Sequence, residues 1–165
     1  MSPVPSFYRN LRLRPAHISY GLVWVAWTLR TYNLDALALI GDEAYYYQWG
    51  YHLDWAYYDH PAGMGVLAWL STLLGGHSEF GIRWLNAVVG TLCVVLVLWL
   101  GRRLSGWLTG VLSAALLAFG APYLITSRFL YTDPLHLAAV LMTVGAYWRL
   151  VRRRDAKSVD GLVLG

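Results

Sequence analysis

The sequence is poor in charged residues and contains a single cysteine. Only 13% of its 165 residues are charged, whereas 58% are hydrophobic. So little polar surface argues against a soluble globular protein and predicts an integral membrane protein, with lipid as the solvent for much of the chain. The single cysteine, Cys93, excludes an intramolecular disulfide and a cysteine-based metal site. We expect Cys93 to face lipid or to pack against other helices.

The chain also lacks a nucleic-acid-binding motif, an internal repeat and a low-complexity linker. Its net charge of +4 comes from small basic groups beside apolar runs, which indicates membrane orientation. We therefore expect no nucleic-acid partner. We treat residues 1–165 as a single membrane domain.

Four apolar stretches predict an all-α integral membrane fold. At ~1.5 Å of rise per residue, they approach or reach the length needed to cross a bilayer core of ~30 Å. The expected spans are residues 16–34, 84–101, 107–127 and 134–151. Residues 35–83 form the long connection between the first two spans, where we expect short interfacial helices and a catalytic-type outer loop.

The arginine clusters predict how the chain is threaded. They precede the first expected span, join the second to the third and follow the fourth, which places all of them on one side of the membrane; they are Arg9, Arg12, Arg14, Arg102, Arg103, Arg149, Arg152, Arg153, Arg154 and Lys157. By the positive-inside rule, both termini are cytoplasmic and the acid-rich loops face outward. We expect a multi-pass protein of the plasma (inner) membrane.

Asp42 and Glu43 open an aromatic-rich segment, DEAYYYQWGYHLDWAYYDHP, just outside the first expected span. Gly41 and Asp42 have the pattern of a helix start, so Asp42 could serve as a helix cap. A carboxylate near apolar side chains at a membrane surface can also become basic enough to accept a proton from a hydroxyl. Both interpretations remain open for Asp42.

Eight aromatic residues lie between Tyr45 and Tyr58. Tyr and Trp favour the headgroup level of a bilayer, so most of these residues are expected to form an interfacial belt. One or two of them could instead stack on a sugar or line the path of a lipid chain.

Two further polar points lie on the predicted outer side. Asp59 and His60 precede Pro61, where His60 can donate a hydrogen bond to an anion; as a metal site this pair is weak, because such sites need three or four ligands. Arg128 and Asp133 lie in the later segment SRFLYTDP. Arg128 could simply extend to the interface, and Asp133 before Pro134 is also typical of a helix start.

The order of these motifs resembles the GT-C superfamily of polyprenyl-phosphate-sugar glycosyltransferases, which includes dolichyl-phosphate-mannose protein mannosyltransferases and lipid A aminoarabinose transferases. The motifs that carry the resemblance are DEAYYYQWG, YYDHPAG, EFGIRWLNAVVG and RFLYTDP, between about Arg30 and Arg149. The resemblance implies an inverting transferase with a GT-C-like N-terminal part. Its partners would be a polyprenyl-phosphate-linked sugar and a lipid, glycan or protein acceptor on the extracytoplasmic side.

By this resemblance, Asp42 matches the catalytic aspartate, the candidate general base, with Glu43 supporting it. Asp59 and His60 match the turn beside the carrier phosphate or a divalent metal, while Asp133 matches a second outer acidic position. Arg128 and His60 are candidates for stabilising the phosphate as it leaves. No cofactor is certain, and a divalent metal is possible.

Two departures from the family pattern follow. Ala62 stands where the family turn usually carries a second proline, and the chain ends at Gly165, where GLVLG reads like the first turn of a fifth span. Because relatives of this type have many more spans, we expect a fragment or truncated form of a longer enzyme. The alternative is a noncatalytic small membrane protein that acts as a lipid-binding or assembly element.

Overall fold

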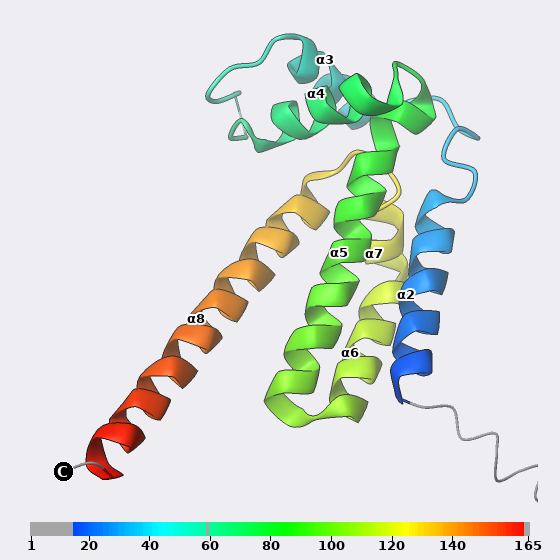
Figure 1. The fold of residues 1–165 in the computed structure, drawn as a ribbon. Coiled ribbons are helices and arrows are strands. Elements are labelled where there is room, and N and C mark those ends of the chain that lie inside the picture. Colours follow the sequence, from blue (N-terminus) through cyan, green and yellow to red (C-terminus); the bar gives the residue numbers. More distant parts are fainter. Residues whose placement is uncertain (1–14, 59, 164–165) are drawn as a thin grey trace, which may run out of the picture.

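The computed structural model describes residues 15–58 and 60–163, and these form an all-helical fold (Figure 1). In chain order the helices are α2 (Pro15–Thr31), α3 (Gly41–Tyr51), α4 (Gly63–Gly75), α5 (Glu79–Ser105), α6 (Trp107–Phe119), α7 (Ala121–Thr126) and α8 (Thr132–Val163). The described residues contain no β-strand, and their one isolated bridge joins Ala56 to Pro61. The prediction of an all-α fold is confirmed.

Helix α5 is the centre of the arrangement, because α2, α4, α6 and α8 all pack against it. Figure 1 shows α2, α5 and α6 running side by side, whereas α8 diverges from them toward its C-terminal end. The two short helices α3 and α4 pack on each other and lie together at one end of α5. They fall inside the predicted outer loop of residues 35–83, where short helices were expected.

Two of the described helices are long and apolar enough to cross a membrane: α5 and the Thr132–Arg152 part of α8. Helices α4 and α6 are apolar but shorter, and α2 has 17 residues. The long helices lie where two of the four spans were expected, while the count of four stays a prediction. Figure 1 places the end of α5 and the end of α8 away from α3 and α4, so Arg102 and Arg103 lie far from the short helices.

The third expected span, residues 107–127, is not one continuous helix. It is broken at Gly120, which has an extended backbone (φ −60°, ψ 117°) between α6 and α7. Pro122 explains the break, because proline has no N–H to donate to the carbonyl four residues earlier and its ring collides with that carbonyl. The carbonyl in question, that of Ala118, instead faces Arg30 Nη2 at 3.5 Å.

The other helix boundaries also differ from those expected. Helix α2 ends at Thr31, and the chain then turns through Asn33, which has a positive φ of 54° that asparagine tolerates. Helix α5 begins at Glu79, before the expected start of the span at residue 84, because Ser78 caps it by accepting a hydrogen bond from Gly81 N (3.1 Å). The early start brings Arg83 inside the helix.

Part of the expected aromatic belt is core instead. Tyr46 and Trp49 are buried, and they pack with Met64, Leu67, Ala68, Ile82 and Leu130. Trp49 also stacks on Tyr57 with ring centroids 4.1 Å apart. In contrast, Trp55 is 93% exposed and Tyr58 is 100% exposed. Some of these aromatic rings therefore pack α3 against α4, whereas others are exposed on the surface.

Cys93 has the packing role that was one of its two expected roles. Its side chain is fully buried, and Sγ donates a weak hydrogen bond to the Pro134 carbonyl at 3.4 Å. This contact joins the middle of α5 to the first turn of α8.

Candidate active site

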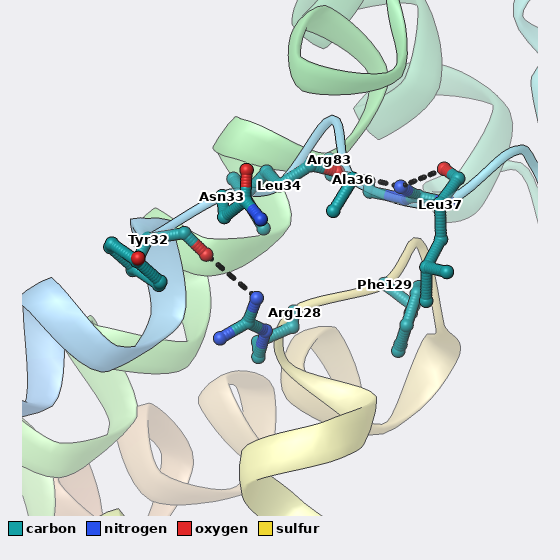
Figure 2. A pocket seen from close by; sticks show the side chains of 8 residues that line it. All are labelled: Tyr32, Asn33, Leu34, Ala36, Leu37, Arg83, Arg128 and Phe129. Carbon is teal, nitrogen blue, oxygen red and sulfur yellow. Dashed lines mark hydrogen bonds between the residues drawn. The ribbon is translucent and has the colours of Figure 1, made fainter.

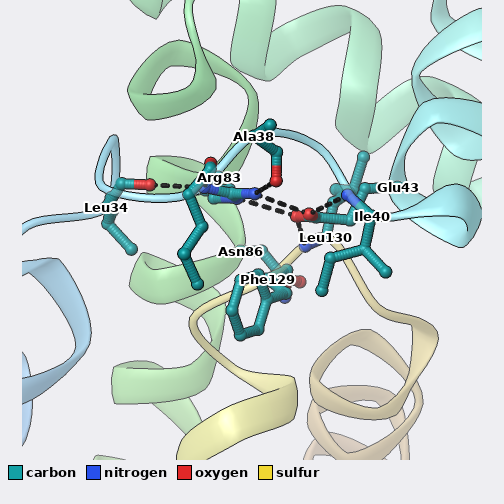
Figure 3. A network of polar contacts seen from close by, with 9 residues as sticks. Leu34, Ala38, Ile40, Glu43, Arg83, Asn86, Phe129 and Leu130 are labelled. Atoms are coloured by element: carbon teal, nitrogen blue, oxygen red, sulfur yellow. Dashed lines mark hydrogen bonds and ion pairs between the residues drawn. The ribbon is translucent and has the colours of Figure 1, made fainter.

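The site is organised around an ion pair between Glu43 of α3 and Arg83 of α5 (Figure 3). Arg83 Nε donates to Glu43 Oε1 at 2.9 Å, and Nη2 donates to Oε2 at 2.7 Å. Both side chains are almost completely removed from solvent, with 1% and 0% exposed. The fork of the guanidinium matches the carboxylate in two parallel bonds, the strongest geometry for such a pair.

The remaining donors of Arg83 bind the segment between α2 and α3. Nη1 donates to the carbonyls of Leu34 (2.6 Å) and Leu37 (2.7 Å), and Nη2 donates to the carbonyl of Ala38 (3.0 Å). All five N–H groups of the guanidinium are thereby used within the protein. Arg83 fixes the approach to α3 and has no donor left for a ligand.

Glu43 accepts two backbone hydrogen bonds in addition to those of Arg83. Ile40 N donates to Oε2 (3.1 Å), and Leu130 N donates to Oε1 (2.9 Å). The first bond satisfies a backbone N–H group at the start of α3, and the second holds the loop before α8. The Glu43 carboxylate thus joins the start of α3, helix α5 and the loop before α8. We call the ion pair together with these two backbone hydrogen bonds the Glu43–Arg83 clasp.

Asp42 lies beside this clasp and is exposed. The N-cap position of α3 is occupied by Ile40, and Glu43 satisfies its N–H, so the interpretation of Asp42 as the helix cap is wrong. Asp42 instead occupies the first helical turn, where the positive end of the helix dipole favours a carboxylate. Its backbone is held by a buried network while its side chain is open to a ligand.

Tyr131 lies within the electrostatic influence of both Asp42 and Asp133. Burial raises the pKa of the Tyr131 phenol, and the negative charges of Asp42, Glu43 and Asp133 raise it further. Both exposed aspartates therefore lie near one phenol, although they come from the first turns of α3 and α8. Asp133 also lies in a helix start, as its position before Pro134 predicted.

His60 lies against the start of α8. It lines a small cavity of about 20 Å³ with Thr132 and His136. Its ring meets the ring of Tyr46 edge to face, with centroids 5.7 Å apart, and its carbonyl accepts a hydrogen bond from Tyr57 N at 2.8 Å. His60 is thus brought next to Thr132, the neighbour of Asp133. Asp59 lies outside the described residues.

Arg128 is directed toward the end of α2 (Figure 2). Its Nη1 donates to the Leu29 carbonyl and its Nη2 to the Tyr32 carbonyl, both at 2.7 Å, which satisfies carbonyls at the end of α2. It lines a cavity of about 270 Å³ together with Arg83 and Phe129. The side chain is half-buried and keeps N–H groups beyond the two that bind α2.

Within residues 15–58 and 60–163, no three His, Cys, Asp or Glu side chains gather in a way that could hold a metal ion. The pairing of Asp59 with His60 stays a prediction, because Asp59 is outside these ranges.

Three residues of the site were missed in the sequence. Arg83 and Asn86 lie three positions apart in a largely apolar part of α5, and Asn86 Nδ2 donates to the carbonyls of Thr126 (3.1 Å) and Phe129. Polar side chains at that spacing in an apolar helix are a usable signal for a buried site. Tyr131 offered no such signal, because two of the carboxylates that act on it, Asp42 and Glu43, are distant in the chain.

Comparison with known proteins gives two matches. A family model described as dolichyl-phosphate-mannose-protein mannosyltransferase matches residues 59–165, a range that contains His60, Arg83, Arg128 and Asp133 but not Asp42 or Glu43. Lipid A galacturonosyltransferase RgtD of Rhizobium johnstonii is 27% identical over 143 residues, which is 81% of this chain and 28% of that protein. The chain thus spans less than a third of the length of this relative. No solved structure matches it significantly.

Proposed function

Because the chain belongs to the dolichyl-phosphate-mannose-protein mannosyltransferase family, we propose that it transfers a sugar from a polyprenyl-phosphate carrier to an acceptor. The resemblance to GT-C glycosyltransferases noted in the sequence is confirmed by this family match and by the likeness to a lipid A galacturonosyltransferase. The acceptor in this proposal is a lipid, glycan or protein group. The chain would act as part of a longer enzyme, with anomeric inversion.

The observation that carries the proposal is the exposed Asp42 on a backbone fixed by the Glu43–Arg83 clasp. The charges of Glu43 and Arg83 neutralise each other, and both side chains use their polar groups within the protein, so neither is available to a ligand. Asp42 is the adjacent carboxylate that is exposed, and its charge raises the pKa of the Tyr131 phenol, as does the charge of Asp133. A general base must be held rigidly and still reach its substrate, and Asp42 meets both conditions.

The proposed reaction uses these residues as follows. The acceptor hydroxyl oxygen forms a bond to the anomeric carbon while the bond from that carbon to the carrier phosphate oxygen breaks. Asp42 takes the hydroxyl proton, and the bonding electrons leave with the polyprenyl phosphate as its anion. Attack from the face opposite the phosphate inverts the anomeric centre. Phosphate is a stable leaving group, so it needs positive charge or hydrogen bonds more than a proton.

His60 and Arg128 are our candidates to supply that stabilisation. His60 lies near the start of α8, beside Thr132, although 72 positions separate the two in the chain. Arg128 is committed in part to the end of α2. The two residues line different cavities, so we expect binding of the carrier phosphate to depend mainly on one of them. Replacing each separately, as His60→Gln and Arg128→Gln, would show which one raises the KM for the donor.

We further propose that Asp42 faces the extracytoplasmic side of a membrane. The two long apolar helices support a membrane protein, and the family match agrees with this. The short helices α3 and α4 lie at the end of α5 opposite Arg102 and Arg103 (Figure 1). By the positive-inside rule that arginine pair would be cytoplasmic, as would both termini.

The test is the substitution Asp42→Asn, with Asp35→Asn as the matched control. Both change one exposed carboxylate into an amide, but Asp35 lies in the connection before α3 and outside the site. The assay measures sugar transfer in membranes that contain the protein expressed from its native coding sequence. A general base contributes ~10²–10⁴ to the rate, so Asp42→Asn should lower kcat by at least about 100-fold with normal insertion.

Equal activity of Asp42→Asn and Asp35→Asn would reject the assignment of Asp42 as the base. If both variants and the unmodified protein show no transfer but bind polyprenyl phosphate equally, the noncatalytic alternative would replace the enzyme. Loss confined to Asp42→Asn supports the transferase.

A further inference from the structure

Two tyrosines of α3 and a histidine after α4 form a closed polar cluster. The hydroxyls of Tyr47 and Tyr51 are 2.7 Å apart, and each lies 3.0 Å from His77 Nδ1. The Tyr51 and His77 rings also stack with centroids 5.5 Å apart. Tyr47 and Tyr51 are one helical turn apart, which brings their hydroxyls to the same face of α3.

This cluster lines a cavity of about 280 Å³. The floor is the close contact of α3 with α4, where a methyl group at Gly50 would meet Trp69 N at 3.0 Å. Trp69 and Thr72 of α4 complete the wall, and no Asp, Glu, Lys or Arg lines the cavity. The lining is therefore aromatic and hydroxylic but carries no fixed charge, which favours a neutral ligand over a phosphate or a carboxylate.

The hydrogen-bond groups of the cluster suit a ligand with several hydroxyls. When Nδ1 accepts from one phenol and that phenol accepts from the other, both hydroxyl protons are used internally. The phenol oxygens then keep lone pairs as acceptors, and His77 Nε2–H remains a donor. Burial raises the pKa of Tyr47 to about 12, as does its hydrogen bond with Tyr51, so the phenol keeps its proton at neutral pH.

The cavity is separated from Asp42. Tyr51 is nine residues further along α3, or about 14 Å at ~1.5 Å per residue. Tyr47 also lies well around the helix from Asp42, at ~100° per residue. A ligand in this cavity would lie at the same end of the molecule as Asp42. The part of the ligand bound there would not be the part that reacts beside Asp42.

We propose that this cavity binds a neutral sugar ring of the acceptor, as a subsite for a ring that does not react. The ring would lie against the aromatic side chains and exchange hydrogen bonds with Tyr47, Tyr51 and His77. The identification of this ligand as the acceptor rests on the proposed transferase function, but the binding of a neutral sugar can be measured without any transfer.

The experiment is saturation-transfer NMR on the protein in lipid nanodiscs, with methyl β-D-glucopyranoside as the neutral probe. Methyl β-D-glucuronide, which has the same ring and a carboxylate, is the charged comparison. The double variant Tyr47→Phe and Tyr51→Phe removes both hydroxyls but keeps both rings. Tyr45→Phe is its matched control, because Tyr45 lies on α3, is 43% exposed and does not line the cavity.

We expect the neutral glycoside to bind the unmodified protein, Tyr45→Phe and Asp42→Asn equally. The double variant should bind it about tenfold more weakly, because it loses hydrogen bonds worth about 1.4 kcal/mol in total. The glucuronide should bind more weakly than the neutral glycoside to the unmodified protein.

Three results would overturn the proposal: no binding of the neutral glycoside, unchanged binding by the double variant, or tighter binding of the glucuronide. If the cluster only fastens α3 to the α4–α5 connection, the double variant would lose thermal stability while its affinity for the glycoside stayed unchanged. Normal transfer by Asp42→Asn would reject the proposed catalytic role of Asp42 and leave the sugar-binding result intact.

Discussion

Glu43 Oε2 and Arg83 Nη2 lie 2.7 Å apart, although the two residues are 40 positions apart in the chain. The ion pair closes a loop of the chain that contains α4 and most of α3. Because Glu43 also receives Leu130 N, the same carboxylate fixes the loop that carries Tyr131. The position of Asp42 is therefore determined mainly by residues that take no part in the proposed chemistry.

Replacing one member of the clasp should be costly. Glu43→Gln leaves the buried Arg83 guanidinium without its counter-charge, and breaking such a pair costs about 3–5 kcal/mol of unfolding free energy. Denaturant unfolding in detergent, followed by circular dichroism, should show this loss. Asp35→Asn, the same change at an exposed position, should shift stability by less than about 0.5 kcal/mol.

The double variant Glu43→Gln and Arg83→Met distinguishes the interaction between the two charges from the separate contribution of each side chain. Removing both charges should cost less than the sum of the two single variants, because neither charge is then left unpaired. Strictly additive losses would mean that Glu43 and Arg83 contribute through their separate backbone contacts.

Gly81 should tolerate no side chain. A methyl group there would lie 2.0 Å from the Gly76 carbonyl oxygen and 2.5 Å from that of Gly75, both of which belong to the backbone. Gly81→Ala should lower stability by about 1–3 kcal/mol or more, because the α4–α5 connection must move. Gly41→Ala is the control, since a methyl group at Gly41 meets nothing within 4 Å. Equal stabilities of the two variants in thermal unfolding would contradict this contact.

The Tyr47 phenol makes stability depend on alkaline pH. Its pKa rises from 10.0 to about 12 in the folded protein, so the folded state holds this proton more tightly than the unfolded state. The resulting stability is complete below pH 10 and is lost as the pH rises toward about 12. Measured over that range, the unfolding free energy of Tyr47→Phe should fall less steeply than that of the unmodified protein; identical slopes would contradict the assignment.

Pro122→Ala should join α6 to α7. Alanine restores an N–H that can donate to the Ala118 carbonyl, which now faces Arg30. Amide hydrogen exchange at Tyr123 should then slow, since the helix would continue through it. The control is Pro134→Ala, where the proline lies in the first turn of α8 and its N–H would have no partner within the helix. Unchanged exchange at Tyr123 would mean that packing, and not Pro122, sets the break.

Local chemistry allowed much of the fold to be predicted. Long apolar runs placed α5 and the first part of α8, and the Asp-Pro pair at residue 133 indicated the start of α8. The break at Gly120 was missed, although Pro122 was visible, because the apolar run continues through it. The hydrophobic pattern reports lipid compatibility and does not by itself show where the backbone hydrogen bonds are interrupted.

The site was less accessible to this reasoning. Asp42 and Glu43 were recognised as a pair. That Glu43 is buried in an ion pair while Asp42 stays exposed depends on Arg83, which was expected just outside a span. The expected role of Arg128 likewise could not include its bonds to Leu29 and Tyr32, since these lie at least 96 positions away. Contacts of that sequence separation are set by helix packing and not by local pattern.

The break between α6 and α7 also has a consequence for a bilayer. Helix α6 has 13 residues and a length of about 20 Å at ~1.5 Å per residue, shorter than a hydrocarbon core of ~30 Å. Helix α7 is tied separately to α5, through Tyr123 Oη and the Gly90 carbonyl at 3.3 Å. In a bilayer, α6 would therefore match the hydrocarbon core only together with α7 or through local thinning of the lipid.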